Sequence, residues 1–283
     1  MQTIVSVSTA IYDGYDMDTA LEGLAKAGVS YVEPAFIKGY MGEFTEADFA
    51  EPKAVGLQHR LNELGLSCLA MSSHIDLGAG DAVDIFKGRM NFAKGIGARL
   101  IVSNTSKWSS RLKFCENIEV LASFAAEIGL VIAIENPGHG EDDLFPNGSD
   151  VKVLLDEIGS EFVRINYDVG NIHTYSHGQV DIPSDLESVL PMVVHLHLKD
   201  MADYDNGWRF CGIGKGLIDW PTIIALVIKL SPGLPLALEI PLRLRRPGYA
   251  DPTRIPDLVP LNVIEQELKD SLTYVQGLLS MSS

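Results

Sequence analysis

The sequence has 283 residues, of which 46% are hydrophobic and 21% are charged, a composition that excludes an intrinsically disordered chain. Its 38 acidic residues outnumber the 22 basic ones and give a formal net charge of −16. A field of this sign repels phosphate backbones and anionic lipid headgroups, so we expect no nucleic-acid partner and no membrane partner.

Short apolar or β-branched runs recur along the chain at intervals that suit strands separated by helices. The length of the chain alone leaves the number of domains open. Eight of the runs have the length of a strand: Thr3–Ser8, Tyr31–Phe36, Ser67–Ser72, Leu100–Asn104, Val131–Glu135, Arg164–Asp168, Val193–Lys199 and Leu236–Ile240.

An amphipathic stretch with helical periodicity follows each predicted strand. These stretches are Asp18–Ala27, Thr45–Leu64, Asp81–Gly95, Phe114–Ile128, Asp150–Ile158, Asp185–Leu190, Pro221–Leu230 and Asn262–Leu279. Glycines follow several of them directly, as at Gly28 and Gly129, where a helix C-cap favours the left-handed backbone conformation.

Strict alternation of strands and helices predicts parallel strands joined by right-handed crossovers. A closed barrel and an open doubly wound sheet both satisfy this rule. Eight units of about 35 residues fill the chain and leave nothing for a second domain. We therefore predict the α/β class and a single (β/α)8 TIM barrel over residues 1–283, with a C-terminal helix at about 262–279.

The cysteines and the N-terminus both bear on the cellular compartment. Cys68, Cys115 and Cys211 are odd in number and lack CxxC spacing, which is typical of reduced thiols. The first residues form a strand-like run without the basic and apolar segments of a signal peptide. Apolar runs stop short of the roughly 18 residues that a membrane span needs. We therefore expect a cytoplasmic protein.

The last four predicted strands each supply a residue that can bind a metal. Three end in carboxylates, Glu135 in VIAIENPG, Asp168 in RINYDVGN and Glu239 in LALEIP, and the fourth carries the two histidines of VVHLHLKD. In a parallel barrel these strand ends meet at one rim. Neighbouring buried carboxylates repel one another unless a cation balances them. The set predicts one divalent metal ion, Mn²⁺ ahead of Mg²⁺, Co²⁺ or Zn²⁺, because most of the ligands are oxygens.

These segments resemble the sugar-phosphate isomerase/epimerase superfamily, the xylose-isomerase-like barrels that include ketose 3-epimerases and inosose-processing enzymes. The resemblance covers essentially the whole chain, and the DVGN and HLKD segments are similar to pentulose-5-phosphate 3-epimerases. It implies that Glu135, Asp168, His197 and Glu239 hold the metal, with His197 as the second histidine of the HxH pair. Four motifs carry it: Ile134-Glu135-Asn136, Asp168-Val169-Gly170-Asn171, His195-Leu196-His197-Leu198-Lys199-Asp200 and Leu238-Glu239.

The resemblance implies isomerisation or epimerisation next to the carbonyl of a sugar or sugar phosphate. In such a reaction a metal stabilises the negative charge of an enediolate. Glu135 and Glu239 end the fifth and eighth predicted strands, so they can approach a bound sugar from opposite faces, one as base and the other as acid. A 1,2-isomerisation that uses one glutamate for both proton transfers stays open.

Two loop residues are candidates for substrate binding. Glu141 lies six residues after Glu135, an offset at which ketose 3-epimerases carry a substrate-binding glutamate, and a solvent-exposed loop carboxylate is the alternative. Asn171 stands where several relatives have a substrate-contacting histidine, so His173, two positions later, is expected to take that role.

Further candidates lie on or after the strands. His195 should face the same side as His197, because side chains alternate along a strand, so it contacts either the substrate or the residues behind the site. His74 and Glu33 lie where barrel enzymes line their mouths. Arg209 is a candidate for binding an anionic group of the substrate.

Three features depart from a simple assignment. Asp203 stands where ketose 3-epimerases place a substrate-binding arginine. The segment 212–216, GIGKG, fits neither a Walker A loop nor a Rossmann turn, so we expect a turn beside the site. A basic cluster follows the eighth strand and is either a solvated loop or a binder of phosphate or carboxylate. Its members are Arg243, Arg245, Arg246 and Arg254.

Three other function classes share this architecture. An inosose dehydratase or isomerase would use a related intermediate, and the dehydratase would expel water. An apurinic-site endonuclease must bind DNA, which the acidic charge disfavours. A non-catalytic sugar-binding barrel would not need all four metal-ligating residues. We therefore expect a small sugar or sugar phosphate as the partner, and homo-oligomers are common among such barrels.

Overall fold

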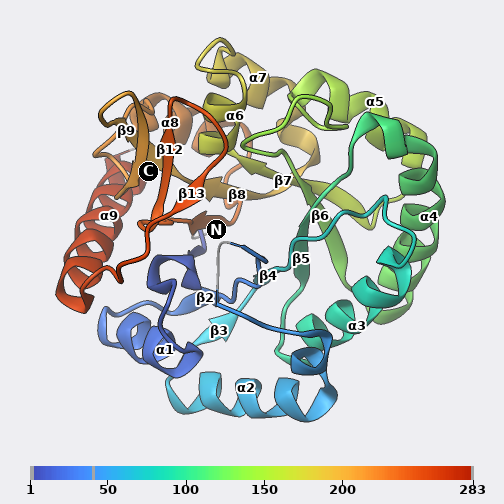
Figure 1. The fold of residues 1–283 in the computed structure, drawn as a ribbon, viewed down its shortest axis with the longest axis horizontal. Coiled ribbons are helices and arrows are strands. Elements are labelled where there is room, and N and C mark those ends of the chain that lie inside the picture. The colour runs from blue at the N-terminus through green and yellow to red at the C-terminus, as the bar shows by residue number, and fades with distance from the viewer. Residues whose placement is uncertain (1–2, 40–41, 282–283) are drawn as a thin grey trace.

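The eight predicted strands all form, and they pair in chain order as one parallel sheet (Figure 1). The computed structural model describes residues 3–39 and 42–281, so the predicted domain limits, residues 1 and 283, lie outside the described part. The strands are β1 (Val5–Ser8), β2 (Tyr31–Glu33), β3 (Ser67–Cys68), β4 (Ala70–Ser72), β5 (Leu100–Asn104), β6 (Val131–Glu135), β7 (Val163–Asp168), β8 (Val193–Leu198) and β11 (Leu236–Leu238).

The sheet closes at the third predicted strand, which is divided into β3 and β4 at Leu69. β3 pairs with β2, and β4 pairs with β5. The Leu69 carbonyl accepts hydrogen bonds from two consecutive amides, those of Arg99 and Leu100, at 2.8 and 3.1 Å. A parallel bridge between Ala35 and Ser72 joins the continuation of β2 to β4. The predicted (β/α)8 TIM barrel is therefore confirmed.

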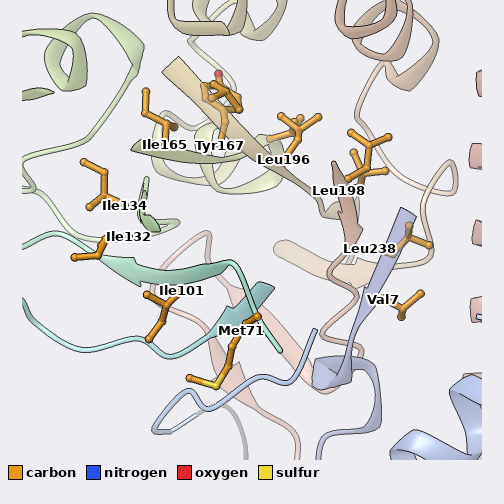
Figure 2. Packing of buried hydrophobic residues seen from close by; sticks show 14 of the residues in the cluster. Val7, Met71, Ile101, Ile132, Ile134, Ile165, Tyr167, Leu196, Leu198 and Leu238 are labelled. Atoms are coloured by element: carbon orange, nitrogen blue, oxygen red, sulfur yellow. The ribbon is translucent and has the colours of Figure 1, made fainter. Parts of the chain in front are cut away.

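Side chains along the strands alternate between the interior of the ring and the layer beneath the helices. Large apolar side chains take the outer positions, and Figure 2 shows them around the ring, facing away from its centre. Leu196 and Leu198 are two of them. His197 lies between these two leucines in sequence and therefore faces the interior. The same alternation turns the polar residues of the other strands towards one another.

Helices cover the outside of the ring (Figure 1). They are α1 (Met17–Lys26), α2 (Glu51–Glu63), α3 (Ala82–Gly95), α4 (Arg111–Ile128), α5 (Gly148–Ile158), α6 (Val169–Tyr175), α7 (Ile182–Val189), α8 (Trp220–Leu230) and α9 (Leu261–Met281). Short 3-10 turns are η1 (Thr9–Tyr12), η2 (Glu46–Phe49), η3 (Trp108–Ser110) and η4 (Leu190–Met192).

One predicted helix is interrupted, and one helix was not predicted. The stretch Thr45–Leu64 contains η2 and α2 separated by Ala50, whose extended backbone (φ −67°, ψ 148°) interrupts the helix. The helix α6 was not predicted. It begins directly after β7 because the Asp168 side chain accepts the Asn171 amide at 2.8 Å and thereby caps its N-terminus.

A second, antiparallel sheet lies beside α6 over one side of the barrel (Figure 1). Its strands come from the segments after β8 and β11, which the sequence showed as loops. The four strands are too short for their periodicity to be read from the sequence. They are β9 (Asp200–Asp203), β10 (Gly207–Cys211), β12 (Leu244–Pro247) and β13 (Thr253–Arg254).

All three cysteines are free, in agreement with the prediction of reduced thiols. Burial raises the pKa of the Cys68 thiol, and the nearby Glu33 charge adds to this effect. A thiol held in its neutral form is a poor nucleophile, so Cys68 has a packing role in the barrel wall. Within residues 3–39 and 42–281, no helix has the length and apolar character that crossing a membrane would require.

Asp200 fixes the glycine-rich segment 212–216 that follows β10. Its fully buried carboxylate accepts N–H groups of Gly214 (3.0 Å), Gly216 (3.1 Å) and the Trp220 indole (2.9 Å). Asp200→Ala leaves these donors unpaired, so we expect it to lower the free energy of unfolding by about 3 kcal/mol or more. Urea unfolding measures this change, with the exposed Asp203→Ala as control. A loss equal to that of the control would contradict the assigned role.

Candidate functional site

Four side chains that could hold a metal ion converge at the C-terminal rim of the strands. His197 Nδ1 lies 3.1 Å from Glu135 Oε2, 3.5 Å from Glu239 Oε2 and 3.8 Å from Asp168 Oδ2. One atom from each residue lies within 4.8 Å of the others, and all four residues are buried. The four residues predicted to hold the metal therefore do lie together.

Glu33 explains why His197 can present its Nδ1 atom to this group. The other ring nitrogen, Nε2, lies 2.8 Å from Glu33 Oε1, and the Ser72 hydroxyl donates to the same oxygen at 2.7 Å. When Nε2–H donates to a carboxylate, the lone pair of Nδ1 is free for a metal, and the ring orientation is fixed. Glu33 on β2 thus orients the ring of His197 on β8.

The arrangement satisfies what a divalent cation requires. His197 Nδ1 is buried and has no hydrogen-bond partner, and the buried oxygens Asp168 Oδ2 and Glu239 Oε2 lie beside it with a lysine as their only cation in the described residues. Such atoms are costly unless an ion or a polar group meets them. Three carboxylate oxygens and one imidazole nitrogen form a mostly hard ligand set. The buried cluster can therefore bind a divalent metal.

Asparagine side chains orient the carboxylates. Asn166 and Asn171 donate to the two oxygens of Glu135, at 2.5 and 3.1 Å. Asn136 exchanges two hydrogen bonds with the Asp168 backbone, at 2.8 and 2.9 Å. The asparagines of the IEN and DVGN motifs thus hold the ends of β6 and β7 together at the site, and Asn166 adds a contact from β7 to Glu135 on β6.

Lys199 brings a positive charge to the same oxygens. Its Nζ atom lies 2.6 Å from Asp168 Oδ2 and 2.5 Å from Glu239 Oε2, and it donates to Asn171 Oδ1 at 3.1 Å. Gly170 gives the stem of this lysine its room, because a Cβ at position 170 would lie 2.8 Å from the Lys199 Cβ. Three carboxylates carry −3, so one divalent ion and Lys199 together would balance them.

The electrostatic environment follows from burial and close charges. Burial would raise the pKa of Glu239, but Lys199 and His197 outweigh it and hold this pKa well below its usual value. His197 likewise lowers the pKa of Glu135 against the effect of burial. Burial raises the pKa of Asp168, although Lys199 opposes it. The surrounding carboxylates raise the pKa of His197 well above its usual value despite burial. A divalent cation competes with that proton, because a metal-bound imidazole is neutral.

A cavity of about 370 Å³ opens beside the cluster. This volume is within the usual range for small-molecule sites. Glu135, Glu239 and Lys199 reach its surface. The other polar residues that line it are Asp13, Lys38, His74, Asp76, Asn104, Thr105, Ser106, Lys107, His139, Asp143, Asn171, Thr174, Arg243 and Arg246.

The five predicted substrate-binding residues lie in different places. His74 lines the cavity, 3.8 Å from Glu135 Oε2. Within the described part of the chain, the cavity-lining residues do not include Glu141, His173, His195 or Arg209.

The four residues outside the cavity lining have other surroundings. Glu141 is exposed in the loop after β6. His173 packs edge-on against Trp208, with ring centroids 5.5 Å apart. His195 is fully buried, and its Nδ1 lies 2.8 Å from Asn166 Oδ1, as in a hydrogen-bonded interior histidine. Arg209 is exposed and lies over the Tyr204 ring.

The predicted basic cluster is largely committed to the fold. Arg243 and Arg254 both form ion pairs with Asp13, at 3.2 and 2.5 Å. Arg246 donates to the carbonyls of Ala250 and Gly138. These contacts fasten β12 and β13 to the loops after β1 and β6, which is the physical reason that the segment is not a solvated loop.

Ser106 and Asp143 line the cavity but were not among the predicted residues. Both lie in loops, where no periodicity indicates the direction of a side chain. Gly140 is the residue near Asp143 in sequence that bears on its position. A side chain at position 140 would collide with the Asp143 carboxylate, because a Cβ there would lie 2.4 Å from Asp143 Oδ2.

Comparisons with known proteins agree with this architecture. A model of the family described as xylose isomerase-like TIM barrels matches residues 21–255. A comparison with curated proteins finds no match.

Three solved structures are similar in fold at low sequence identity. An L-ribulose 3-epimerase is 13% identical, with a TM-score of 0.74 over 99% of this chain and 96% of the other. The 3-keto-D-glucoside 4-epimerase YcjR of E. coli is 14% identical, with a TM-score of 0.71 over 98% and 100%. The IolI protein, solved with a bound zinc atom, is 14% identical, with a TM-score of 0.74 over 99% of each chain. Since the family match spans most of the barrel, this chain belongs to the xylose isomerase-like TIM barrels.

Proposed function

We propose that this protein is a divalent-metal-dependent isomerase or epimerase that acts on a sugar by proton transfer next to a carbonyl. The observation that carries the proposal is the convergence of Glu135, Asp168, His197 and Glu239 beside a cavity large enough for a monosaccharide. Two of the four, Glu135 and Glu239, line the cavity, and their carboxylates can accept and donate protons.

The metal, when bound, would polarise the carbonyl oxygen of the substrate and favour the negative charge that develops there. Glu135 and Glu239 would serve as the two proton-transfer groups. One carboxylate removes the proton from the carbon next to the carbonyl, and the other takes up a proton from solvent and returns it to the opposite face. The Asn166 and Asn171 amides hold Glu135 in a fixed orientation for this step.

His74 is proposed to contact the substrate near Glu135. Its Nε2 atom is buried, has no hydrogen-bond partner, and belongs to a side chain that lines the cavity. A hydroxyl or carbonyl oxygen of a bound sugar would satisfy this nitrogen. Glu141, His173, His195 and Arg209 contribute to substrate binding only if their segments rearrange.

Hydrogen exchange with solvent tests the proposal directly. We expect the protein with Mn²⁺ to incorporate deuterium from D₂O at a carbon next to the carbonyl of one or more ketoses, because proton removal precedes either outcome. Mass spectrometry measures the incorporation, and chelator-treated protein is the control. A product lighter by one water would indicate a dehydratase instead, and no exchange across pentuloses and hexuloses would contradict the proposal.

A further inference from the structure

The loops after β5 and β6 pair with each other and form one wall of the cavity. Lys107 and Asp143 make an antiparallel bridge, and the Leu144 amide donates to the Ser106 carbonyl at 3.0 Å. Ser106, Lys107 and Asp143 all line the cavity. Leu144 and Phe145 are buried directly after them, so the wall is anchored in the core.

Ser106 has a buried hydroxyl without a hydrogen-bond partner. The residue is 6% exposed, and its Oγ atom is among the buried side-chain atoms with no partner. Gly78 leaves room for this hydroxyl, because a Cβ at position 78 would lie 2.3 Å from Ser106 Oγ. An unsatisfied hydroxyl destabilises a folded protein. A polar group that enters the cavity would remove that cost.

Asp143 is the acidic partner on the same wall. Burial raises the pKa of this carboxyl to about 6, and the nearby Lys107 charge only partly opposes the rise. The absence of a side chain at Gly140 leaves room for the carboxylate, because a Cβ there would lie 2.4 Å from Asp143 Oδ2. Glu141, two residues earlier, is exposed. The loop after β6 therefore turns Asp143, and not Glu141, towards the cavity.

Most N–H donors of the buried basic residues in the cavity are already committed to acceptors of the protein. A phosphate dianion needs several N–H donors that converge on it. The buried basic side chains Arg243, Arg246 and Lys199 already donate to carboxylates or carbonyls of the protein, and Arg243 keeps a single N–H group, Nε, without a partner. Among the described lining residues, the other lysines and arginines are Lys38 and Lys107, which are exposed.

We propose that Ser106 and Asp143 form a subsite for the hydroxyl groups of an uncharged polyhydroxy substrate, and that the cavity takes unphosphorylated sugars. This inference rests on the proposed function. Sugar hydroxyls donate to a carboxylate and also accept from a serine hydroxyl, so one class of ligand can bond to both side chains. Neutral hydroxyls need no converging cations.

Substitution of the two residues tests the subsite. The probes are D-ribulose and D-fructose, compared with D-ribulose 5-phosphate and D-fructose 6-phosphate, in the Mn²⁺-loaded protein. We expect deuterium exchange with a higher kcat/KM for the unphosphorylated sugars. Ser106→Ala and Asp143→Asn should each raise the KM of the preferred sugar about 10-fold, with kcat changed less than about 3-fold, since each loses a ground-state hydrogen bond.

Two exposed neighbours provide matched controls. Ser109→Ala and Asp142→Asn should leave KM unchanged, because both residues are exposed and neither lines the cavity. Ser106→Ala should not lower the Tm of the protein without sugar, because its hydroxyl has no partner to lose. A higher kcat/KM for either phosphorylated sugar, or an unchanged KM in both cavity variants, overturns the inference.

A binding measurement separates this inference from the proposed function. If none of the four sugars exchanges deuterium, the proposed reaction fails, and calorimetry with D-fructose, D-ribulose and inorganic phosphate decides the subsite. Binding of an unphosphorylated sugar that weakens about 10-fold in Ser106→Ala and Asp143→Asn supports it. Tighter binding of inorganic phosphate, or no binding of either unphosphorylated sugar, overturns it.

Discussion

Replacing Glu239 by glutamine is expected to reduce the rate of deuterium exchange about 1,000-fold, because general acid–base groups commonly contribute factors of this size. Glutamine retains the shape of the side chain and an oxygen that can face a metal, but it cannot accept or return a proton. The proposed function gives Glu239 both a metal-binding and a proton-transfer role, and its Oε2 atom lies 3.5 Å from His197 Nδ1 with the carboxylate at the cavity surface.

The prediction separates the two roles of Glu239. Exchange is followed by mass spectrometry with the most reactive ketose, and Mn²⁺ affinity is followed by calorimetry. We expect metal binding to weaken much less than turnover, because Glu135, Asp168 and His197 are unchanged. The exposed Glu141→Gln is the control. Turnover close to that of the unmodified protein would remove Glu239 from the proton-transfer step.

The convergence of the candidate metal-binding residues could be predicted from the sequence because strand geometry is simple. Parallel strands place their C-terminal ends at one rim, and a polar residue that ends an apolar run must lie there. Glu135, Asp168 and Glu239 follow this rule. The rule cannot decide whether His195 or His197 faces the carboxylates, because both side chains of β8 point into the interior of the barrel. The choice depends on tertiary contacts: His197 Nδ1 faces the three carboxylates, whereas His195 Nδ1 lies 2.8 Å from Asn166 Oδ1.

The cavity wall could not be predicted, because it depends on contacts between loops. Ser106 and Asp143 are brought together only when the segments after β5 and β6 pair. The arginines after β11 show the reverse case, in which the sequence suggests a binding cluster that the fold already uses. Their sequence suggests a free basic cluster, but Asp13, 230 positions before Arg243, binds two of them. Charge clusters in loops therefore say little about binding until their partners are known.

Glu33→Gln is expected to weaken Mn²⁺ binding by about 10- to 100-fold, although Glu33 is not one of the four converging ligands. Partners of metal-bound histidines commonly contribute this much to metal affinity. The Glu33 carboxylate lies 2.8 Å from His197 Nε2, and nearby His197 and His195 lower its pKa to about 2 against the effect of burial. It is therefore ionised at neutral pH and makes the imidazole a better donor through Nδ1. A neutral amide supplies less of this effect.

A graded series distinguishes orientation of the ring from general damage to the barrel. Ser72→Ala removes the other hydrogen bond to Glu33 Oε1, at 2.7 Å, and leaves His197 untouched, so we expect a loss of Mn²⁺ affinity of only a few-fold. The exposed Glu51→Gln should have no effect. Calorimetric titration measures all three affinities, and circular dichroism checks that the variants are folded. Equal affinities for Glu33→Gln and the unmodified protein would mean that β2 does not orient the histidine on β8.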